Sequence, residues 1–216
     1  MLLKRGYTGK DVKTLQRLLH LQDDGVFGVL TEERVKEWQR EHGLVADGIV
    51  GDKTWAAMTA DSTQLLKSKR VINEIIVHCT ATPEGVDKTV AQIRANHVAP
   101  VSKGGRGWSD IGYHYVVYRD GCVHEGRNVN ISGAHCTGHN SHSIGVVYVG
   151  GLENKPGVAY SKLKPKDTRT QAQKDALVKL LKDLRKLYPT ARIRGHRDFA
   201  NKACPSFDAT KEYSQI

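Results

Sequence analysis

The chain has 216 residues, and its 33 Lys and Arg residues outnumber its 23 Asp and Glu residues, giving a formal net charge of +10. Hydrophobic residues make up 39% and charged residues 26%, as in soluble globular proteins with one large or two small domains. The basic excess favours an anionic partner, but charge alone does not choose among nucleic acid, an acidic membrane face and an anionic polymer. No RNA-recognition or helix-turn-helix pattern is present, so we expect no nucleic-acid partner.

The opening segment and the cysteines indicate in which cellular compartment we expect the protein. The opening segment MLLKRGYTGKDVKTLQ lacks the apolar stretch of a secretory signal, and no apolar run approaches the ~18 residues of a membrane span. We therefore expect synthesis in the cytoplasm and no stable membrane insertion. The cysteines show no CxxC spacing and are expected to be free thiols; they are Cys79, Cys122, Cys136 and Cys204.

An internal repeat marks the first third of the chain. DGVFGVLT (24–31) returns as DGIVGDKT (47–54), with Asp-Gly, Gly and Thr in register. Each Asp-Gly predicts a turn, and Thr31 and Thr54 are expected to cap the helices that follow. Apolar spacing predicts three helices, so residues 1–60 are expected to form a small three-helix domain; the helices are expected at 10–19, 31–44 and 54–58.

The first domain resembles a known family. Residues 9–58 carry LQ and WQ on the expected helices and GL and TW around the second repeat. With the two DG-x-[FV]-G turns, this pattern is similar to that of the type 1 peptidoglycan-binding domain. The resemblance implies binding to the cell wall. The polar and basic residues 61–70 are expected to form a linker.

The pattern changes from residue 71 onward, where apolar β-rich runs alternate with helical patterns. This alternation predicts an α/β domain over residues 71–216, with a mixed central β-sheet flanked by helices. The clearest helix follows Thr170, which forms a capping-box signature with Gln173. One apolar stripe runs along this helix and is expected to face the core; its members are Ala176, Leu177, Leu180, Leu181, Leu184 and Leu187.

The segment GHRDFANKACPSFD (195–208) brings His196 and Cys204 close together in the sequence. Imidazole and thiolate are preferred ligands of zinc, and a catalytic zinc usually has three protein ligands and one water. His78 ends an expected buried strand, and functional residues gather at such strand ends in α/β sheets. From these residues alone, His78 could equally be a structural histidine, and the other two could be ordinary loop residues.

A second resemblance covers about residues 71–208. The segments IIVHCTAT, GWSDIGYHYVVYRDG, GAHCTGHNSHSIGVVYVGG and GHRDFANKACPSFD occur in that order. Together they resemble the zinc-dependent N-acetylmuramoyl-L-alanine amidases of type 2, which include the T7-type phage lysozymes and share the fold of peptidoglycan recognition proteins. Four ordered motifs in one domain are far more specific than any one of them.

The resemblance implies a role for each matching residue. His78, His196 and Cys204 would bind one zinc ion per chain, while Tyr113 and Lys202 would form the catalytic pair. A zinc-activated water would then attack the lactyl carbonyl of muramic acid where it is joined to L-alanine. Three further residues are expected to contact the substrate: His135, Trp108 and Thr80.

The expected protein is thus a modular peptidoglycan hydrolase, an amidase held at its polymeric substrate by a wall-binding domain. The T7-type match and the missing signal suggest a phage endolysin, expected to be monomeric, that is made in the host cytoplasm and reaches the wall through a separate membrane lesion. Three alternatives remain. They are a non-catalytic recognition protein, a cytosolic amidase that recycles muropeptides, and a zinc peptidase that cuts within the stem peptide.

Overall fold

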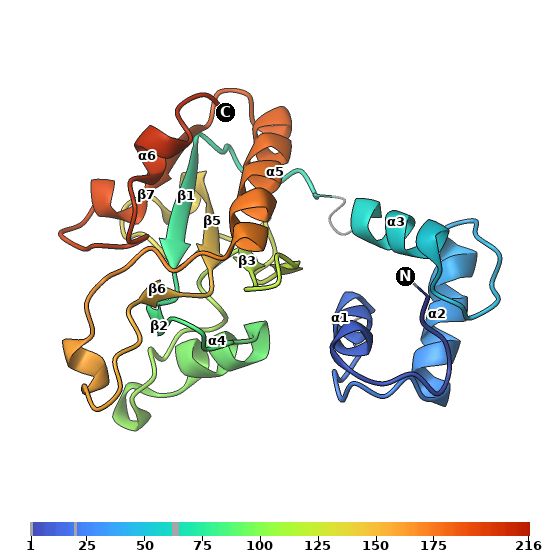
Figure 1. The fold of residues 1–216 in the computed structure, drawn as a ribbon. Helices are drawn as coiled ribbons and strands as arrows, with labels where there is room; N and C mark the ends of the chain where they lie inside the picture. Colours follow the sequence, from blue (N-terminus) through green and yellow to red (C-terminus); the bar gives the residue numbers. More distant parts are fainter. Residues whose placement is uncertain (1, 20, 62–64) are drawn as a thin grey trace. The chain divides into compact units, whose positions relative to one another are not determined.

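The computed structural model describes residues 2–19, 21–61 and 65–216, and the chain divides into two compact units, residues 1–64 and 65–216 (Figure 1). We refer to them as the N-terminal and C-terminal units. Among the described residues, no helix combines the length and apolar character that a membrane crossing requires.

The described part of the N-terminal unit contains three helices, as predicted: α1 (Lys10–Leu18), α2 (Val29–Glu41) and α3 (Asp52–Asp61). Their apolar faces enclose a small core, because apolar residues recur at helical spacing along α1 and α2. The buried members of this core are Leu3, Val12, Leu15, Leu19, Phe27, Val35, Trp38, Val50 and Met58.

The sequence repeat is also a repeat of structure. Gln16 Nε2 donates to Thr31 Oγ1 at 3.2 Å, and Gln39 Nε2 donates to Thr54 Oγ1 at the same distance. Each glutamine also donates to the aspartate of its own Asp-Gly turn, at 2.7 Å in the first repeat and 3.0 Å in the second. The recurring Asp-Gly and Thr therefore hold a buried glutamine, and each satisfied amide links a helix to the following turn.

The expectation that Thr31 and Thr54 cap helices is wrong. α2 begins at Val29 and α3 at Asp52, so both threonines lie inside the first turn of their helix. Both side chains are buried. Their hydroxyls instead accept hydrogen bonds from the buried glutamines. A local capping rule does not predict this contact, because its partners are 15 residues apart.

The C-terminal unit is built on a five-stranded sheet in the order β4-β3-β5-β1-β7. All neighbouring strands are parallel except β3 and β4, so the predicted mixed α/β sheet is confirmed. A two-stranded parallel sheet, β2 with β6, lies outside it. The elements are β1 (Glu74–Cys79), β2 (Thr82–Pro83), α4 (Val90–Val98), β3 (Tyr115–Val117), β4 (Val123–Glu125), β5 (Ser143–Tyr148), β6 (Gly151–Leu152), α5 (Gln171–Leu187), β7 (Arg192–Gly195) and α6 (Ala209–Glu212).

Helices cover the sheet because alternate residues of each strand point to opposite faces. Tyr115 and Val117 of β3 pack in one core with the leucines of α5, which lies beside the strands in Figure 1. Val116 points the other way and packs with Ile93 of α4. The α5 leucines that are buried belong to the predicted stripe; they are Leu177, Leu180, Leu181 and Leu184.

The start of α5 is fixed by the predicted capping box between Thr170 and Gln173. Gln173 is fully buried, and its Nε2 also donates to the carbonyls of Val117 on β3 and Val149 after β5. The helix is therefore tied to two neighbouring strands through one amide.

Of the expected linker 61–70, residue 61 ends α3, residues 62–64 lie outside the described residues, and residues 65–70 belong to the C-terminal unit. The amide of Ser68 donates to Tyr188 Oη at 2.6 Å, and its hydroxyl donates to the Val129 carbonyl at 2.7 Å. Leu65 packs against the core of the same unit.

Candidate metal centre and active site

The site begins with two neighbouring parallel strands. β1 and β7 pair in register with Val77 opposite Gly195, so the next residues, His78 and His196, leave the two strands side by side. His78 lies on β1, and His196 begins a 3-10 turn directly after β7. The carboxyl ends of adjacent parallel strands thus place both imidazoles at one edge of the sheet, as the strand-end argument predicted.

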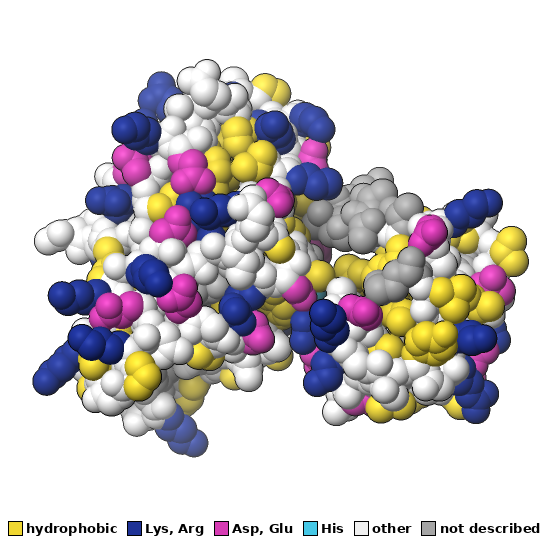
Figure 2. Space-filling view, viewed as in Figure 1, with side chains coloured by type: hydrophobic (Ala, Val, Ile, Leu, Met, Phe, Trp, Pro, Cys, Tyr) yellow, Lys and Arg dark blue, Asp and Glu magenta, His cyan; other side chains and the backbone are white. Residues whose placement is uncertain are grey.

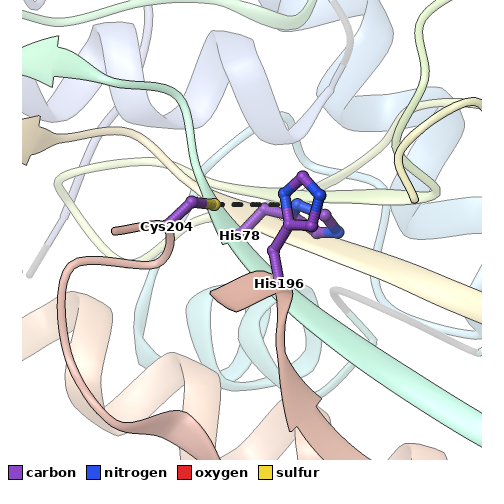
Figure 3. Close-up of side chains that lie close together, drawn as sticks. All are labelled: His78, His196 and Cys204. Atoms are coloured by element: carbon purple, nitrogen blue, oxygen red, sulfur yellow. Dashed lines mark hydrogen bonds between the residues drawn. The ribbon is translucent and has the colours of Figure 1, made fainter. Parts of the chain in front are cut away.

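Cys204 completes a set of three donors. The donor atoms of His78, His196 and Cys204 all lie within 4.8 Å of one another, and Figure 3 shows the three side chains converging from separate segments. Cys204 Sγ lies 3.7 Å from His78 Nδ1. Two such ligands on one tetrahedral zinc would be about 3.6 Å apart, given Zn–S and Zn–N bonds of about 2.3 and 2.0–2.1 Å. The donor set and its spacing therefore fit zinc.

The electrostatics of the donors also suit a metal. Burial and the neighbouring histidines hold the pKa of His78 well below its usual value, so its imidazole is neutral and available as a ligand. Burial and the charge of Lys202 lower the pKa of His196 as well. The adjacent Cys79 thiol and burial raise the pKa of the Cys204 thiol, so without a metal this sulfur keeps its proton at neutral pH.

His135 lies against a metal-site residue. Its Nδ1 is 3.0 Å from Nε2 of His78, the ring nitrogen that does not face Cys204. If His78 keeps the lone pair of Nδ1 for a metal, its Nε2–H donates to His135. The other nitrogen of His135 then points to Ser143 Oγ at 3.4 Å. His135 is only 7% exposed, which suits a partner of His78 better than a residue that contacts substrate.

Two glycines make room for His135. A Cβ added at Gly133 would lie 2.4 Å from Cδ2 of His135, and one added at Gly145 would lie 2.5 Å from the same atom. The role of these two glycines could not be predicted from the sequence, where Gly145 is only one residue of an apolar run typical of a buried strand. The contact depends on the tertiary packing of two segments.

Tyr113 lies among the site histidines. Its ring centroid is 5.2 Å from that of His78 and 5.5 Å from that of His97. Burial raises the pKa of the Tyr113 phenol, so the hydroxyl stays protonated at neutral pH. A protonated phenol at this position can donate a hydrogen bond.

Lys202 is exposed on the loop between His196 and Cys204. Its positive charge contributes to lowering the pKa values of His78 and His196, so its field reaches the donor set. A loop that carries a cation two residues before a ligand can present positive charge to a reacting group without burying the lysine.

The two remaining predicted substrate contacts differ in their surroundings. Trp108 is partly buried, its ring lies 4.8 Å from that of His97, and the Arg106 guanidinium lies 5.8 Å from its centroid. Through His97 it adjoins Tyr113. Thr80 directly follows β1, but its hydroxyl is 2.7 Å from Thr82 Oγ1 and accepts from the Gly150 amide at 3.0 Å.

An α/β unit with two histidines at the ends of adjacent parallel strands and a cysteine on the loop that follows defines a candidate zinc hydrolase. Comparison with known families agrees: residues 68–207 match the family model described as N-acetylmuramoyl-L-alanine amidase. The chain belongs to this family and is a peptidoglycan amidase. Residues 8–58 match a peptidoglycan binding domain family, so peptidoglycan is its substrate.

Curated relatives include phage endolysins. The chain is 41% identical to the endolysin of Enterobacteria phage K11 over 136 residues, which cover 63% of this chain and 82% of the relative. It is 39% identical to the endolysin of Escherichia phage T7 over 142 residues, which cover 66% of this chain and 85% of the relative.

Solved structures show the same fold. The Ph2119 endolysin from a Thermus scotoductus bacteriophage is 30% identical, with a TM-score of 0.50 over 65% of this chain and 80% of that one. The amidase endolysin LysCS from Clostridium intestinale is 26% identical, with a TM-score of 0.51 over 67% of this chain and 81% of that one.

Proposed function

We propose that the chain is a phage endolysin of the zinc-dependent type that hydrolyses the amide bond between N-acetylmuramic acid and L-alanine. The observation that carries this proposal is the His78, His196 and Cys204 donor set at the strand ends of an amidase-family domain. One zinc ion per chain and a monomeric protein are part of the proposal.

His78, His196 and Cys204 would hold the zinc. When bound, zinc supplies a Lewis acid that polarises the scissile carbonyl and lowers the pKa of a water to about 7. Hydrolysis of the amide adds one water across the C–N bond, leaving a lactyl carboxylate on the sugar and a free amino group on L-alanine. His135 would accept a hydrogen bond from His78 Nε2–H, which would leave Nδ1 of His78 free as a metal ligand.

Tyr113 and Lys202 would act on the charge that develops during the reaction. The Tyr113 hydroxyl, kept protonated by its raised pKa, donates a hydrogen bond to the carbonyl oxygen as it becomes negative. The Lys202 ammonium adds a positive charge from the loop before Cys204. Trp108 and Thr80 are proposed to line the path of the substrate beside Tyr113 and β1.

The N-terminal unit would hold the enzyme on the wall. Binding there raises the local concentration of scissile bonds around the catalytic unit. We propose that the protein is made in the host cytoplasm and acts on the wall after release through the inner membrane. The +10 net charge favours association with an anionic envelope. Figure 2 shows Lys and Arg side chains spread over the visible face among Asp and Glu.

The alternatives predict different behaviour. A non-catalytic recognition protein needs neither Cys204 nor Lys202, whereas this chain has both. An amidase that recycles soluble muropeptides gains nothing from a wall-binding unit, so turnover should be the same on sacculi with and without that unit.

The metal dependence of the activity tests the proposal. The protein should contain zinc at the His78, His196 and Cys204 site, and removing it with a chelator should abolish peptide release from purified sacculi. Adding zinc back should restore the release. Undiminished peptide release by chelated, zinc-free protein would overturn the proposal.

A further inference from the structure

A second cluster of donors lies away from the proposed catalytic zinc. Donor atoms of Glu74, His139 and His142 lie within 4.8 Å of one another among the described residues, as do those of the first set. Glu74 and His78 point to the same face of β1, because they are four residues apart on a strand. At about 3.3 Å per residue, the two clusters are roughly 13 Å apart along the strand.

The two histidines are placed on one side of a short turn. His142 ends the 3-10 turn Asn140–His142 and His139 precedes it, so they are three residues apart. A 3-10 helix has three residues per turn, and side chains at this spacing eclipse one another. Both imidazoles therefore face Glu74, whose strand pairs with β5 at Ser143.

The distances match a shared metal. Glu74 Oε2 is hydrogen-bonded to His139 Nδ1 at 2.8 Å, a contact that a shared ion would replace, and it lies 3.4 Å from His142 Nε2. Ligands at 2.0–2.1 Å from one ion are about 2.9 Å apart in an octahedral site and about 3.4 Å apart in a tetrahedral one. All three side chains remain partly exposed, at 18%, 29% and 33%, so an ion can enter and keep water ligands.

The surrounding backbone holds the cluster in place. Asn140 Oδ1 accepts from the amides of His135 and Cys136, and Ser143 Oγ donates to the His139 carbonyl at 2.7 Å. The ring of Phe199 lies 4.0 Å from that of His139 and fixes its plane. Such supporting contacts lower the entropy cost of assembling ligands around an ion.

We propose that Glu74, His139 and His142 form a second binding site for a borderline divalent ion such as Zn²⁺ or Co²⁺. Two imidazoles and one carboxylate suit such ions better than Mg²⁺ or Ca²⁺, which prefer oxygen ligands. The site lacks a thiolate, and Arg192 lies opposite Glu74 in the register of β1 and β7, where its positive charge is close in the sheet. The second ion therefore binds more weakly than the first.

A titration of the full-length, metal-stripped protein tests this site. Zn²⁺ competed against a chelating dye should bind in two steps. Cys204→Ser should remove the tight step and keep the weak one, whereas Glu74→Gln and His142→Ala should each weaken the second step at least tenfold and keep the first. His42→Ala, a histidine variant in the N-terminal unit, should leave both steps unchanged.

Two further measurements distinguish the loss of a metal site from the misfolding of a variant. Co²⁺ should give a thiolate-to-metal absorption band with the first equivalent only, and the second equivalent should add only weaker d–d bands. In the Cys204→Ser protein, Zn²⁺ should still raise the Tm, because an ion that binds only the folded state stabilises it. A single equivalent in the wild type, or a second step that survives His142→Ala and Glu74→Gln unchanged, would overturn the proposal.

Discussion

At the scale of single residues, Cys204 is the most diagnostic member of the proposed zinc site. Replacing it by serine removes the only sulfur donor of the set, so Cys204→Ser should lower zinc affinity more than ~100-fold. This loss is larger than the loss expected when a residue that only hydrogen-bonds to a ligand is removed. Activity on sacculi should disappear with the metal. Cys122→Ser, outside the donor set, is the control, and a zinc-loaded, active Cys204→Ser protein would refute the assignment.

The pH dependence of zinc binding follows from the same residue. The raised pKa of the Cys204 thiol means that metal binding must expel one proton at neutral pH. The lowered pKa values of His78 and His196 mean that these ligands expel none. Zinc affinity should therefore rise with pH near neutrality, and an affinity that stays flat from pH 6.5 to 8 would contradict the release of a proton from Cys204.

Lys202 separates metal binding from catalysis. Lys202→Ala should retain zinc, because the lysine donates no ligand, but should lose on the order of 10²–10³ in kcat if its charge stabilises the transition state. Zinc content and turnover on sacculi measure the two effects separately. Unchanged turnover would remove Lys202 from the mechanism.

His135 acts through His78 in this account, so its replacement should have a graded effect. His135→Ala removes the acceptor of His78 Nε2–H and should weaken zinc binding 10–100-fold. His135→Asn offers an amide oxygen near the position of Nδ1 and should recover part of that loss. Equal zinc affinity in the wild type and His135→Ala would leave His135 with no positioning role.

At the scale of elements, the buried histidines make the stability of the C-terminal unit depend on pH. Burial lowers the pKa of His114 to about 4, whereas an unfolded histidine titrates near 6.5. Between these values the unfolded state binds the extra proton, so stability falls as pH falls, by up to about 1.4 kcal/mol per pH unit for this residue. Metal-free protein should lose Tm between pH 7 and 5, and a Tm that stays constant there would contradict the burial of the neutral ring.

The start of α5 gives a second test at this scale. Gln173→Ala removes the capping box and the buried side-chain donor to the Val117 and Val149 carbonyls, of which Val117 keeps the Val149 amide; this should cost about 1–3 kcal/mol of unfolding free energy. Gln171→Ala, which loses only an exposed contact with Asp175, is the matched control. Urea unfolding of the metal-free proteins compares the two, and equal stability of both variants would contradict the role of Gln173.

Much at this scale was predictable from periodicity. Apolar β-rich runs predicted buried strands such as β1 and β5, and the leucine stripe predicted α5, because burial imposes these patterns. Strand-end reasoning and the family resemblance together brought His78 to His196 and Cys204. The Glu74 cluster was not predicted, although the His139–His142 spacing was visible. The pairing of β1 with β5 brings Glu74 to those histidines, and no local pattern encodes that pairing.

At the scale of the whole molecule, the two units divide the work. Deleting residues 1–64 should weaken binding to sacculi, while the remaining unit still cleaves small amide substrates, because its core and donor set lie entirely within residues 65–216. Pull-down on sacculi and turnover of a soluble fragment measure the two effects. Sacculus binding that survives the deletion would place the wall contact on the catalytic unit.

The bond that is cut tests the central claim most directly. Mass analysis of the products released from purified sacculi reads the new chain ends created by hydrolysis. The account predicts peptides with a free amino-terminal L-alanine and glycan strands whose muramic acid carries an intact lactyl carboxylate. New termini within the stem peptide, or new reducing ends in the glycan, would contradict it.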